Sequence, residues 1–435
     1  MTKNSDWAAP GRKSSGAVFI ICPYIVQGAH RVIDPEARLE EAKGLAEAIQ
    51  LDIKGTEFFK QHTIRPATYI SKGHVEDLQG PLKGLDVDLV FIDAPISPVQ
   101  QRNLEKAWDC KVIDRTGLIL EIFGTRARTA EGRLQVELAA LTYQRSRLVR
   151  SWSHLERQRG GLSFVGGPGE TQLELDRRMI DERIIRIKKE LHKVQQTRSL
   201  HRKARKRVPY PVVALVGYTN AGKSTLFNRL TRADVMAENL LFATLDPTMR
   251  RVTLPSRREI ILSDTVGFIS DLPTLLVAAF RATLEEVMEA DLILHVRDIS
   301  HPESEAQKRD VLTVIEELGL EKAYEEHGIE VLNKTDLLTR QQVRFFSAQA
   351  KRAVNPAQCL VSALDGAGIE SLLEKVDTFL ARQDKPYTFS LPLSEGKKIA
   401  WLYAHGEVVS RKDDEDKAHL TVKLSSENKE KFDRV

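Results

Sequence analysis

The chain has 435 residues, of which 42% are hydrophobic and 29% are charged, and this length and balance predict several globular domains. It contains no apolar run of 18 residues, no signal-peptide pattern, no prenylation cysteine and no paired spacing of its three cysteines. These features argue against membrane, lipid-anchored and disulfide-stabilised secreted proteins, and we expect a cytoplasmic protein. The net charge of +4 is uneven, because residues 145–207 hold 18 Lys or Arg against seven Asp or Glu, a local charge of +11. Such a basic segment indicates a polyanionic partner.

Residues 1–15 are polar and predict a disordered tail. Residues 16–127 alternate apolar strands with amphipathic helices, which predicts a small N-terminal α/β domain with a parallel sheet. Its clearest strand covers 87–93, and a strand followed by a turn is expected within 58–69.

Three polar residues of this region, Asp93, Ser97 and Asp114, follow predicted strands. Open α/β sheets bind ligands at that edge, so these residues are candidates for a ligand site. Helix capping and turn formation explain them equally well, since Ser97 precedes Pro98 in the order typical of a helix start.

Residues 128–207 contain two segments with heptad-spaced apolar residues, joined by a loop. The helical pattern covers 115–148 and again 179–206. Each apolar stripe needs a partner, so an antiparallel helical hairpin is favoured over two independent surface helices.

The joining loop, residues 159–172, holds five glycines and one proline and is not expected to form regular structure. Arg157, Arg159, Phe164 and Gly167 are the candidate RNA contacts, because arginine pairs with phosphates and aromatic rings stack on bases. A disordered linker with solvated charge explains the same composition, and the sequence does not separate the two.

Residues 208–384 are expected to form a nucleotide-binding domain around residues 217–224, Gly-Tyr-Thr-Asn-Ala-Gly-Lys-Ser. This G-x-x-x-x-G-K-S motif follows an apolar run and opens a helical pattern, as a phosphate-binding loop requires. Its glycines let the backbone approach phosphate oxygens. Lys223 is expected to reach the β- and γ-phosphates and the Ser224 hydroxyl to coordinate Mg²⁺.

Three more motifs follow in the order typical of GTPases. Residues 264–267, D-x-x-G, place a carboxylate near Mg²⁺ and a glycine near the γ-phosphate. Residues 333–336, N-K-x-D, suit guanine, because the Asp336 carboxylate can accept from N1–H and the 2-amino group, a donor pair that adenine lacks. Residues 362–364 supply a backbone amide for the guanine oxygen. Together the motifs predict a translation-factor-type GTPase domain.

A switch segment between these motifs must supply a second hydroxyl to Mg²⁺ when the γ-phosphate is present. Thr244 is the expected ligand and Thr248 a lesser candidate. The residues with catalytic roles are Lys223, Thr244 and Gly267. The metal ligands are Ser224, Thr244 and, through a water, Asp264. The nucleotide-binding residues are Gly217, Tyr218, Thr219, Asn220, Ala221, Gly222, Lys223, Ser224, Phe242, Ala243, Thr244, Leu245, Asp246, Asp264, Thr265, Val266, Gly267, Asn333, Lys334, Thr335, Asp336, Ser362, Ala363 and Leu364.

Residues 385–435 predict a small C-terminal α+β domain. Strands are expected at 387–391, 407–409 and 420–424, a helix at 397–405, and a frayed, charged end at 425–435. The fold class is therefore α/β multidomain, with a P-loop GTPase domain preceded by a small α/β domain and a helical hairpin and followed by a small α+β domain.

Several stretches closely resemble the HflX family of GTPases. They are the phosphate loop, the switch Phe-Ala-Thr-Leu-Asp at 242–246, Asp-Thr-Val-Gly-Phe-Ile at 264–269, and the stretches 100–105, 112–116 and 167–174. The resemblance covers nearly the whole chain. It implies a protein that binds the large ribosomal subunit and splits stalled ribosomes into subunits, with the glycine-rich loop directed at the peptidyl-transferase centre. We further expect ribosomal RNA as a partner, Mg²⁺ as the cofactor and a monomeric protein. The family's N-terminal domain has also been linked to ATP, although no phosphate loop occurs there.

The sequence departs from common patterns at two places, and each departure affects the expected function. Residues 160–167 lack one glycine and one arginine that the family loop usually has, which removes one RNA-facing charge. Phe268 stands where many GTPases place a water-orienting glutamine, and a phenyl ring cannot orient water by hydrogen bonding. We therefore expect slow intrinsic hydrolysis that a partner such as the ribosome accelerates.

Two other functions are compatible with parts of the sequence. One is an RNA-binding protein with an inert GTPase domain, against which stand the intact Lys223, Ser224, Thr244 and Asp264. The other is a GTP-controlled signalling or membrane-associated switch, which the lack of a lipidation motif disfavours.

Overall fold

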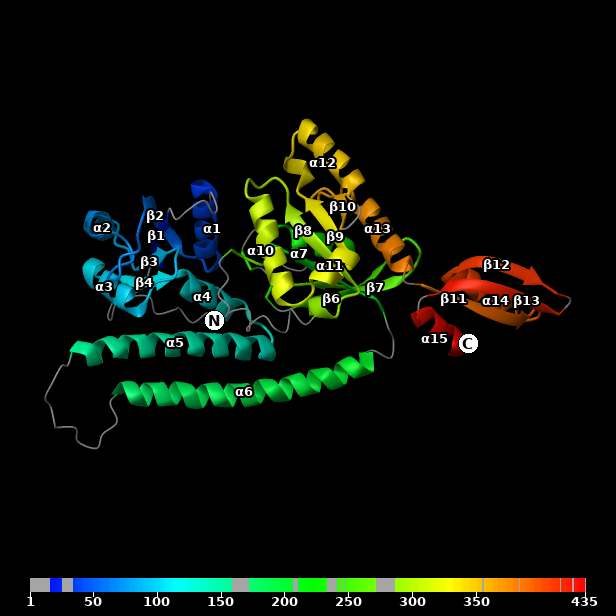
Figure 1. The fold of residues 1–435 in the computed structure, drawn as a ribbon, viewed down its shortest axis with the longest axis horizontal. Helices are drawn as coiled ribbons and strands as arrows, with labels where there is room; N and C mark the ends of the chain where they lie inside the picture. Colours follow the sequence, from blue (N-terminus) through cyan, green and yellow to red (C-terminus); the bar gives the residue numbers. More distant parts are fainter. Residues whose placement is uncertain are drawn as a thin grey trace.

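The structure of the protein, a computed structural model, describes residues 16–25, 34–158, 172–205, 210–232, 241–242, 244–245, 247–270, 286–353, 356–382, 384–414, 416–424 and 426–434. Three β-sheets follow one another along the chain, and a long helical hairpin lies beneath the first two in the view of Figure 1. The predicted fold class is confirmed. Across the described ranges, no helix is long and apolar enough to cross a membrane.

The N-terminal sheet is parallel and has the strand order β2-β1-β3-β4. Its strands are β1 (Ala17–Ile25), β2 (Asp52–Gln61), β3 (Leu89–Ile92) and β4 (Lys111–Asp114). The helices are α1 (Pro35–Ala48), α2 (Lys72–Gly84), α3 (Pro98–Trp108) and α4 (Arg115–Arg126). Helices lie on both faces, so the strands are buried on both sides and read as nearly continuous apolar runs.

The helical pattern that the sequence shows over 115–148 is divided between two helices. Helix α4 ends at Arg126, where Ala127 adopts an extended conformation. A new helix, α5 (Ala130–Gln158), begins after Thr129, whose hydroxyl accepts from the Gly132 amide at 2.9 Å. This threonine cap turns the chain from the sheet into the hairpin.

The predicted helical hairpin consists of α5 and α6 (Gln172–Arg205), which lie side by side in Figure 1. Val136 and Ala139 of α5 and Ile184, Ile187 and Leu191 of α6 are buried. The Arg183 guanidinium donates two hydrogen bonds, of 2.7 and 3.0 Å, to the Glu137 carboxylate on the neighbouring helix. Loop 159–171 between the helices lies outside the described residues.

The central sheet has the order β10-β9-β8-β5-β7-β6 and is parallel except for the β6–β7 pair. Its strands are β5 (Val212–Gly217), β6 (Thr248–Thr253), β7 (Glu259–Asp264), β8 (Leu292–Asp298), β9 (Gly328–Asn333) and β10 (Ala357–Leu360). The helical segments are α7 (Lys223–Thr231), α10 (Ser304–Glu317), α11 (Glu321–His327), η1 (Thr335–Leu337), α12 (Arg340–Arg352) and α13 (Ile369–Ala381). Because parallel strands end at one edge, the motifs that follow β5, β7, β9 and β10 come together there.

The C-terminal part is a three-stranded antiparallel sheet with the order β11-β13-β12. Its elements are β11 (Lys385–Pro392), α14 (Gly396–His405), β12 (Glu407–Asp413), β13 (Lys417–Leu424) and α15 (Ser426–Arg434). The expectation of a frayed end was wrong, because α15 is a helix whose Phe432 is buried against Phe389, with 4.7 Å between the ring centroids. A single apolar anchor in a charged segment shows no periodicity, which is why the sequence pattern missed it.

Candidate active site at the carboxyl edge of the central sheet

The phosphate loop leaves β5 and enters α7 as the sequence predicts. Gly217 has φ 152°, and a Cβ there would lie 2.2 Å from the Val296 carbonyl oxygen. Gly222 has φ 91°, and a Cβ there would lie 2.3 Å from the Asn333 amide nitrogen. Both positions therefore require glycine, because the loop is packed against two neighbouring strands.

Lys223 is buried at the start of α7, and its ammonium group donates to the Tyr218 carbonyl oxygen at 2.7 Å. Burial lowers the pKa of Lys223 to about 8, although the Asp264 carboxylate opposes this. A cation that is poorly compensated by its own protein is suited to bind an anion such as phosphate.

Three oxygen-bearing side chains meet beside this lysine. The Ser224 hydroxyl lies 2.8 Å from the Asp264 carboxylate and 3.0 Å from the Thr244 hydroxyl, and Thr244 lies 2.8 Å from the same carboxylate oxygen. The second oxygen of Asp264 is buried without a partner among the described residues. Burial also raises the pKa of Asp264. Hydroxyl and carboxylate oxygens are the ligands that Mg²⁺ prefers, so this cluster fits that ion.

The cluster includes Thr244 and not the lesser candidate, Thr248, which is the first residue of β6 and pairs with Asp264 only through the strand register. On either side of Thr244, Phe242 and Leu245 are buried. Ala243 and Asp246 lie outside the described residues.

The predicted base-binding loops are held together by Asn333. Its side chain donates to the Ala221 carbonyl at 2.8 Å and accepts from the Ala363 amide at 3.0 Å. It thus joins the phosphate loop to residues 362–364. In this structure the Asn333 side chain therefore positions these two loops relative to each other.

The other residues of the base-binding motif also have defined partners. The Ser362 hydroxyl donates to Asp336 at 2.7 Å, and the Lys334 ammonium pairs with Asp298 at 2.7 Å. Thr335 begins the short helix η1, whereas Leu364 is 70% exposed. Asp336 itself is exposed at this edge of the loop.

The segment after β7 is tied to the phosphate loop by backbone hydrogen bonds. The Thr219 amide donates to the Phe268 carbonyl at 2.7 Å, and the Phe268 amide donates to the Gly217 carbonyl at 3.1 Å. A Cβ at Gly267 would lie 2.8 Å from the Thr219 Cα. Thr265 and Val266 are buried beside it, and the Thr265 hydroxyl donates to the Leu215 carbonyl at 2.5 Å. The ring of Phe268 is 3% exposed and packs in the core.

A buried polar network behind this segment was not predicted. Arg115 is 2% exposed and lies at the centre of the network. It pairs with Asp93 at 2.5 Å and with Glu41, and it donates to the carbonyl and hydroxyl oxygens of Ser270 at 3.1 Å each. Arg38 pairs with the other oxygen of Asp93, also at 2.5 Å.

The network includes Asp93, one of the three candidates for a ligand site in the N-terminal sheet. Burial opposes the ionisation of Asp93, yet Arg115 and Arg38 hold its pKa below its ordinary value. Ser97 caps α3, and Asp114 caps α4 through the Gly117 amide at 2.7 Å. Ser97 and Asp114 thus serve as helix caps, whereas Asp93 forms buried ion pairs rather than a cap. No local sequence pattern could reveal the pairs of Asp93, because its partners lie on other elements.

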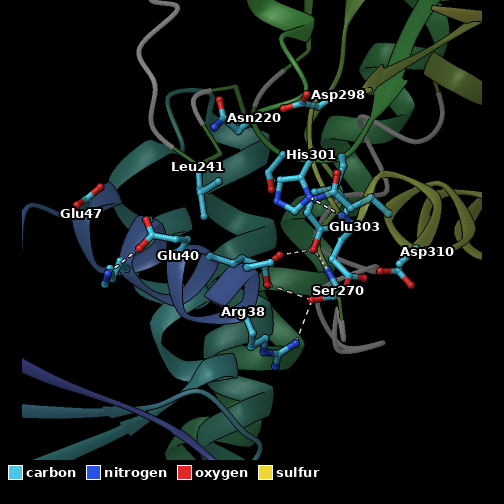
Figure 2. A pocket seen from close by; sticks show the side chains of 18 residues that line it. Arg38, Glu40, Glu47, Asn220, Leu241, Ser270, Asp298, His301, Glu303 and Asp310 are labelled. Carbon is cyan, nitrogen blue, oxygen red and sulfur yellow. Dashed lines mark hydrogen bonds and ion pairs between the residues drawn. The ribbon is translucent and has the colours of Figure 1, made fainter. Parts of the chain in front are cut away.

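A cavity of about 320 Å³ separates α1 from the mouth of the phosphate loop. Figure 2 shows Glu40 and Glu47 of α1 on one side and Asn220 and Asp298 on the other. The N-terminal sheet therefore places a helix directly beside the predicted nucleotide site. The sequence predicted the N-terminal α/β domain and the nucleotide-binding domain separately, and it gave no sign that α1 lies beside the phosphate loop.

The predicted RNA contacts receive no structural description. Arg159, Phe164 and Gly167 lie outside the described residues, and Arg157 is described only as part of the backbone of α5.

Family models match most of the chain. Their descriptions are "GTP-binding GTPase N-terminal" at residues 36–124, "GTP-binding GTPase Middle Region" at 126–205, "50S ribosome-binding GTPase" at 212–334 and "HflX C-terminal domain" at 348–435.

Curated relatives are similar over almost their full length. A protein named GTPase HflX from Magnetococcus marinus is 49% identical over 89% of this chain and 88% of its own. The GTPase HflX of Escherichia coli is 45% identical over 78% of both chains. Among solved structures, a GTP-binding protein from Sulfolobus solfataricus in complex with GDP is 22% identical, with a TM-score of 0.45, over 84% of this chain and 99% of its own.

Proposed function

The chain belongs to the HflX family of GTPases, and on this premise we propose that it binds the large ribosomal subunit and uses GTP to help split or rescue stalled ribosomes. The chain is a GTPase. The finer parts of the proposal are the partner, the metal ion and the role of each site residue.

The hydroxyl and carboxylate cluster supports Mg²⁺ as the metal. We assign Ser224 and Thr244 as direct ligands and Asp264 as a ligand through water. When bound, the ion neutralises charge on the β- and γ-phosphates. Lys223 would add a buried cation beside the same phosphates, and we assign the amide of Gly267 to contact the γ-phosphate.

The observation that carries the ribosome proposal is the burial of Phe268. At 3% exposure and with both backbone groups bonded to the phosphate loop, this residue cannot orient an attacking water. We therefore expect the protein to hydrolyse GTP slowly until a partner completes the site. A family model described as a 50S ribosome-binding GTPase matches the same residues, which supports the large subunit as that partner.

The hairpin supports RNA as the contacted surface. Helices α5 and α6 form a rigid, basic extension, with loop 159–171 between them. We propose that Arg157, Arg159, Phe164 and Gly167 contact ribosomal RNA there. We further propose that the protein acts as a monomer in the cytoplasm.

The decisive experiment measures GTP turnover by the purified protein with Mg²⁺, alone and with purified large ribosomal subunits. We expect slow turnover alone and strong stimulation by the subunits. Equal rates with and without subunits would refute the ribosome-activated mechanism and leave the GTPase activity standing. Co-sedimentation with ribosomal subunits and with liposomes then separates a ribosome factor from a GTP-controlled RNA-binding or signalling switch.

A further inference from the structure

Helix α12 has an unusual charge composition for a surface helix. Residues 340–352 read Arg-Gln-Gln-Val-Arg-Phe-Phe-Ser-Ala-Gln-Ala-Lys-Arg, with four cations and no carboxylate. Thr339 and Gln342 form a reciprocal capping box at its start, so its first turn is well anchored. In Figure 1 the helix lies at the top of the GTPase domain, on the side opposite the hairpin.

One side of α12 packs against the GTPase domain. Val343, Phe346 and Ala350 are half-buried, recur at helical spacing and face β10, which α12 contacts. The larger apolar residues of the helix are therefore already used by the protein, with one exception. Phe345 points outward and is 65% exposed, with the neighbouring Phe346 ring 5.4 Å away in an edge-to-face contact.

The outer side of α12 presents the four cations. Arg340, Arg344, Lys351 and Arg352 are all exposed. Within the described part of the chain, none of them has an ion pair or a side-chain hydrogen bond. Around the helix axis, Arg340, Arg344 and Lys351 lie within about 40° of one another, and Arg352 lies about 80° farther round on the same outer side. Together they extend along about 18 Å of the helix.

We propose that this outer face of α12, defined by Arg340, Arg344, Phe345, Lys351 and Arg352, binds the phosphate backbone of ribosomal RNA at a place separate from the hairpin tip. The proposal rests on the proposed function. A row of unpaired cations matches the uninterrupted negative charge of an RNA strand. Arginine binds phosphate in a bidentate manner, and an exposed phenyl ring offers a stacking platform for a base.

Two other partners fit this face less well. A membrane-binding helix inserts an apolar face into lipid, whereas the apolar face of α12 packs on its own domain. A protein partner would have to present carboxylates to all four cations without its own basic residues intervening. RNA meets the charge requirement at every phosphate.

The test compares two triple variants with the same loss of charge. One is Arg340→Gln, Arg344→Gln and Arg352→Gln. The control is Lys83→Gln, Lys322→Gln and Lys397→Gln, three exposed lysines on other helices that likewise have no ion pair within the described ranges. GTP binding by each variant verifies its fold. Affinity for large ribosomal subunits and for protein-free large-subunit RNA is measured at several salt concentrations.

We expect the α12 variant to bind subunits on the order of tenfold more weakly than the control, and to bind the protein-free RNA more weakly as well. The slope of log affinity against log salt should become shallower by about 2, since each phosphate contact contributes roughly 0.7–0.9. A Phe345→Ala variant should lose about fivefold in affinity with an unchanged slope, because stacking does not release counterions.

The outcomes separate this inference from the proposed function. If the unmodified protein does not bind large subunits, the proposed function fails and this inference fails with it. If it binds and the two triple variants behave alike, only the inference about α12 is overturned. Loss of subunit binding with unchanged RNA binding would identify a ribosomal protein as the partner and overturn the RNA assignment.

Discussion

The backbone amide of Ser270 donates a hydrogen bond of 2.7 Å to the hydroxyl of Tyr218. Tyr218 belongs to the phosphate loop, and Ser270 follows the Asp-Thr-Val-Gly-Phe-Ile motif. The same hydroxyl donates to Glu41 of α1, which also accepts from the Ser270 hydroxyl at 3.0 Å. One tyrosine therefore joins the phosphate loop, the segment that follows β7 and helix α1 of the N-terminal domain.

Replacing Tyr218 with phenylalanine should destabilise the protein by about 1–3 kcal/mol. The change leaves the buried Ser270 amide without its acceptor and one oxygen of the Glu41 carboxylate without its donor, and a buried polar group without a partner costs free energy. Thermal unfolding should show the loss, and the Ser270 amide should exchange with deuterium faster. Tyr24→Phe is the matched control, because the Tyr24 hydroxyl has no hydrogen bond within the described residues. Equal melting temperatures for the two variants would contradict the role of this hydroxyl.

Replacing Thr244 with alanine should lower GTP turnover roughly 100-fold in the presence of ribosomal subunits. We assign the Thr244 hydroxyl as a Mg²⁺ ligand in the GTP-bound state, and the variant lacks that hydroxyl. Binding of GDP should change little. Thr248→Ala removes the same groups from a residue outside the cluster and should hydrolyse GTP at the normal rate. A larger loss in the Thr248 variant would reassign the ligand.

Replacing Asp336 with asparagine should weaken GTP binding about tenfold to 100-fold, the range for a lost hydrogen bond to a charged group. The side chain then offers a donor to the donor groups of guanine, whereas xanthine carries an accepting oxygen at position 2. Competition binding should show improved selection of XTP over GTP. Asp365→Asn is the control, because Asp365 also accepts from Ser362 but lies outside the N-K-x-D motif. Unchanged selectivity in the Asp336 variant would exclude this carboxylate as the guanine reader.

Nucleotide binding should take up protons at alkaline pH. In the free protein, burial lowers the pKa of Lys223 to about 8, and bound phosphates favour its charged form and raise that pKa. Below about pH 7 the ammonium is charged in both states, so binding moves no proton. At pH 8.5 the free lysine is largely neutral and must gain a proton, so affinity falls as pH rises. Calorimetry at pH 8.5 in buffers of different ionisation enthalpy should therefore give different binding heats, and identical heats would rule out the linkage.

The nucleotide site was predictable from the sequence because its geometry is local. The glycine loop, the D-x-x-G segment and the N-K-x-D segment each follow a strand, and parallel strands end at one edge, so the order of motifs implies their proximity. The hairpin was predictable for a similar reason, since heptad spacing on two neighbouring segments requires a shared interface. The helical end of the chain was not predictable, because Phe432 is the only buried apolar residue in the described part of α15, and a single residue shows no periodicity.

The sequence by itself determined which chemistry this protein performs, because phosphate loops and base-reading motifs are short and their backbone requirements are written into consecutive residues. Only the tertiary structure decided how that site is connected to the rest of the molecule. Arg115 reaches Ser270 across 155 residues and Tyr218 reaches Glu41 across 177. Long-range hydrogen bonds of this kind produce no periodic pattern in the sequence, because each depends on where two separately folded layers meet.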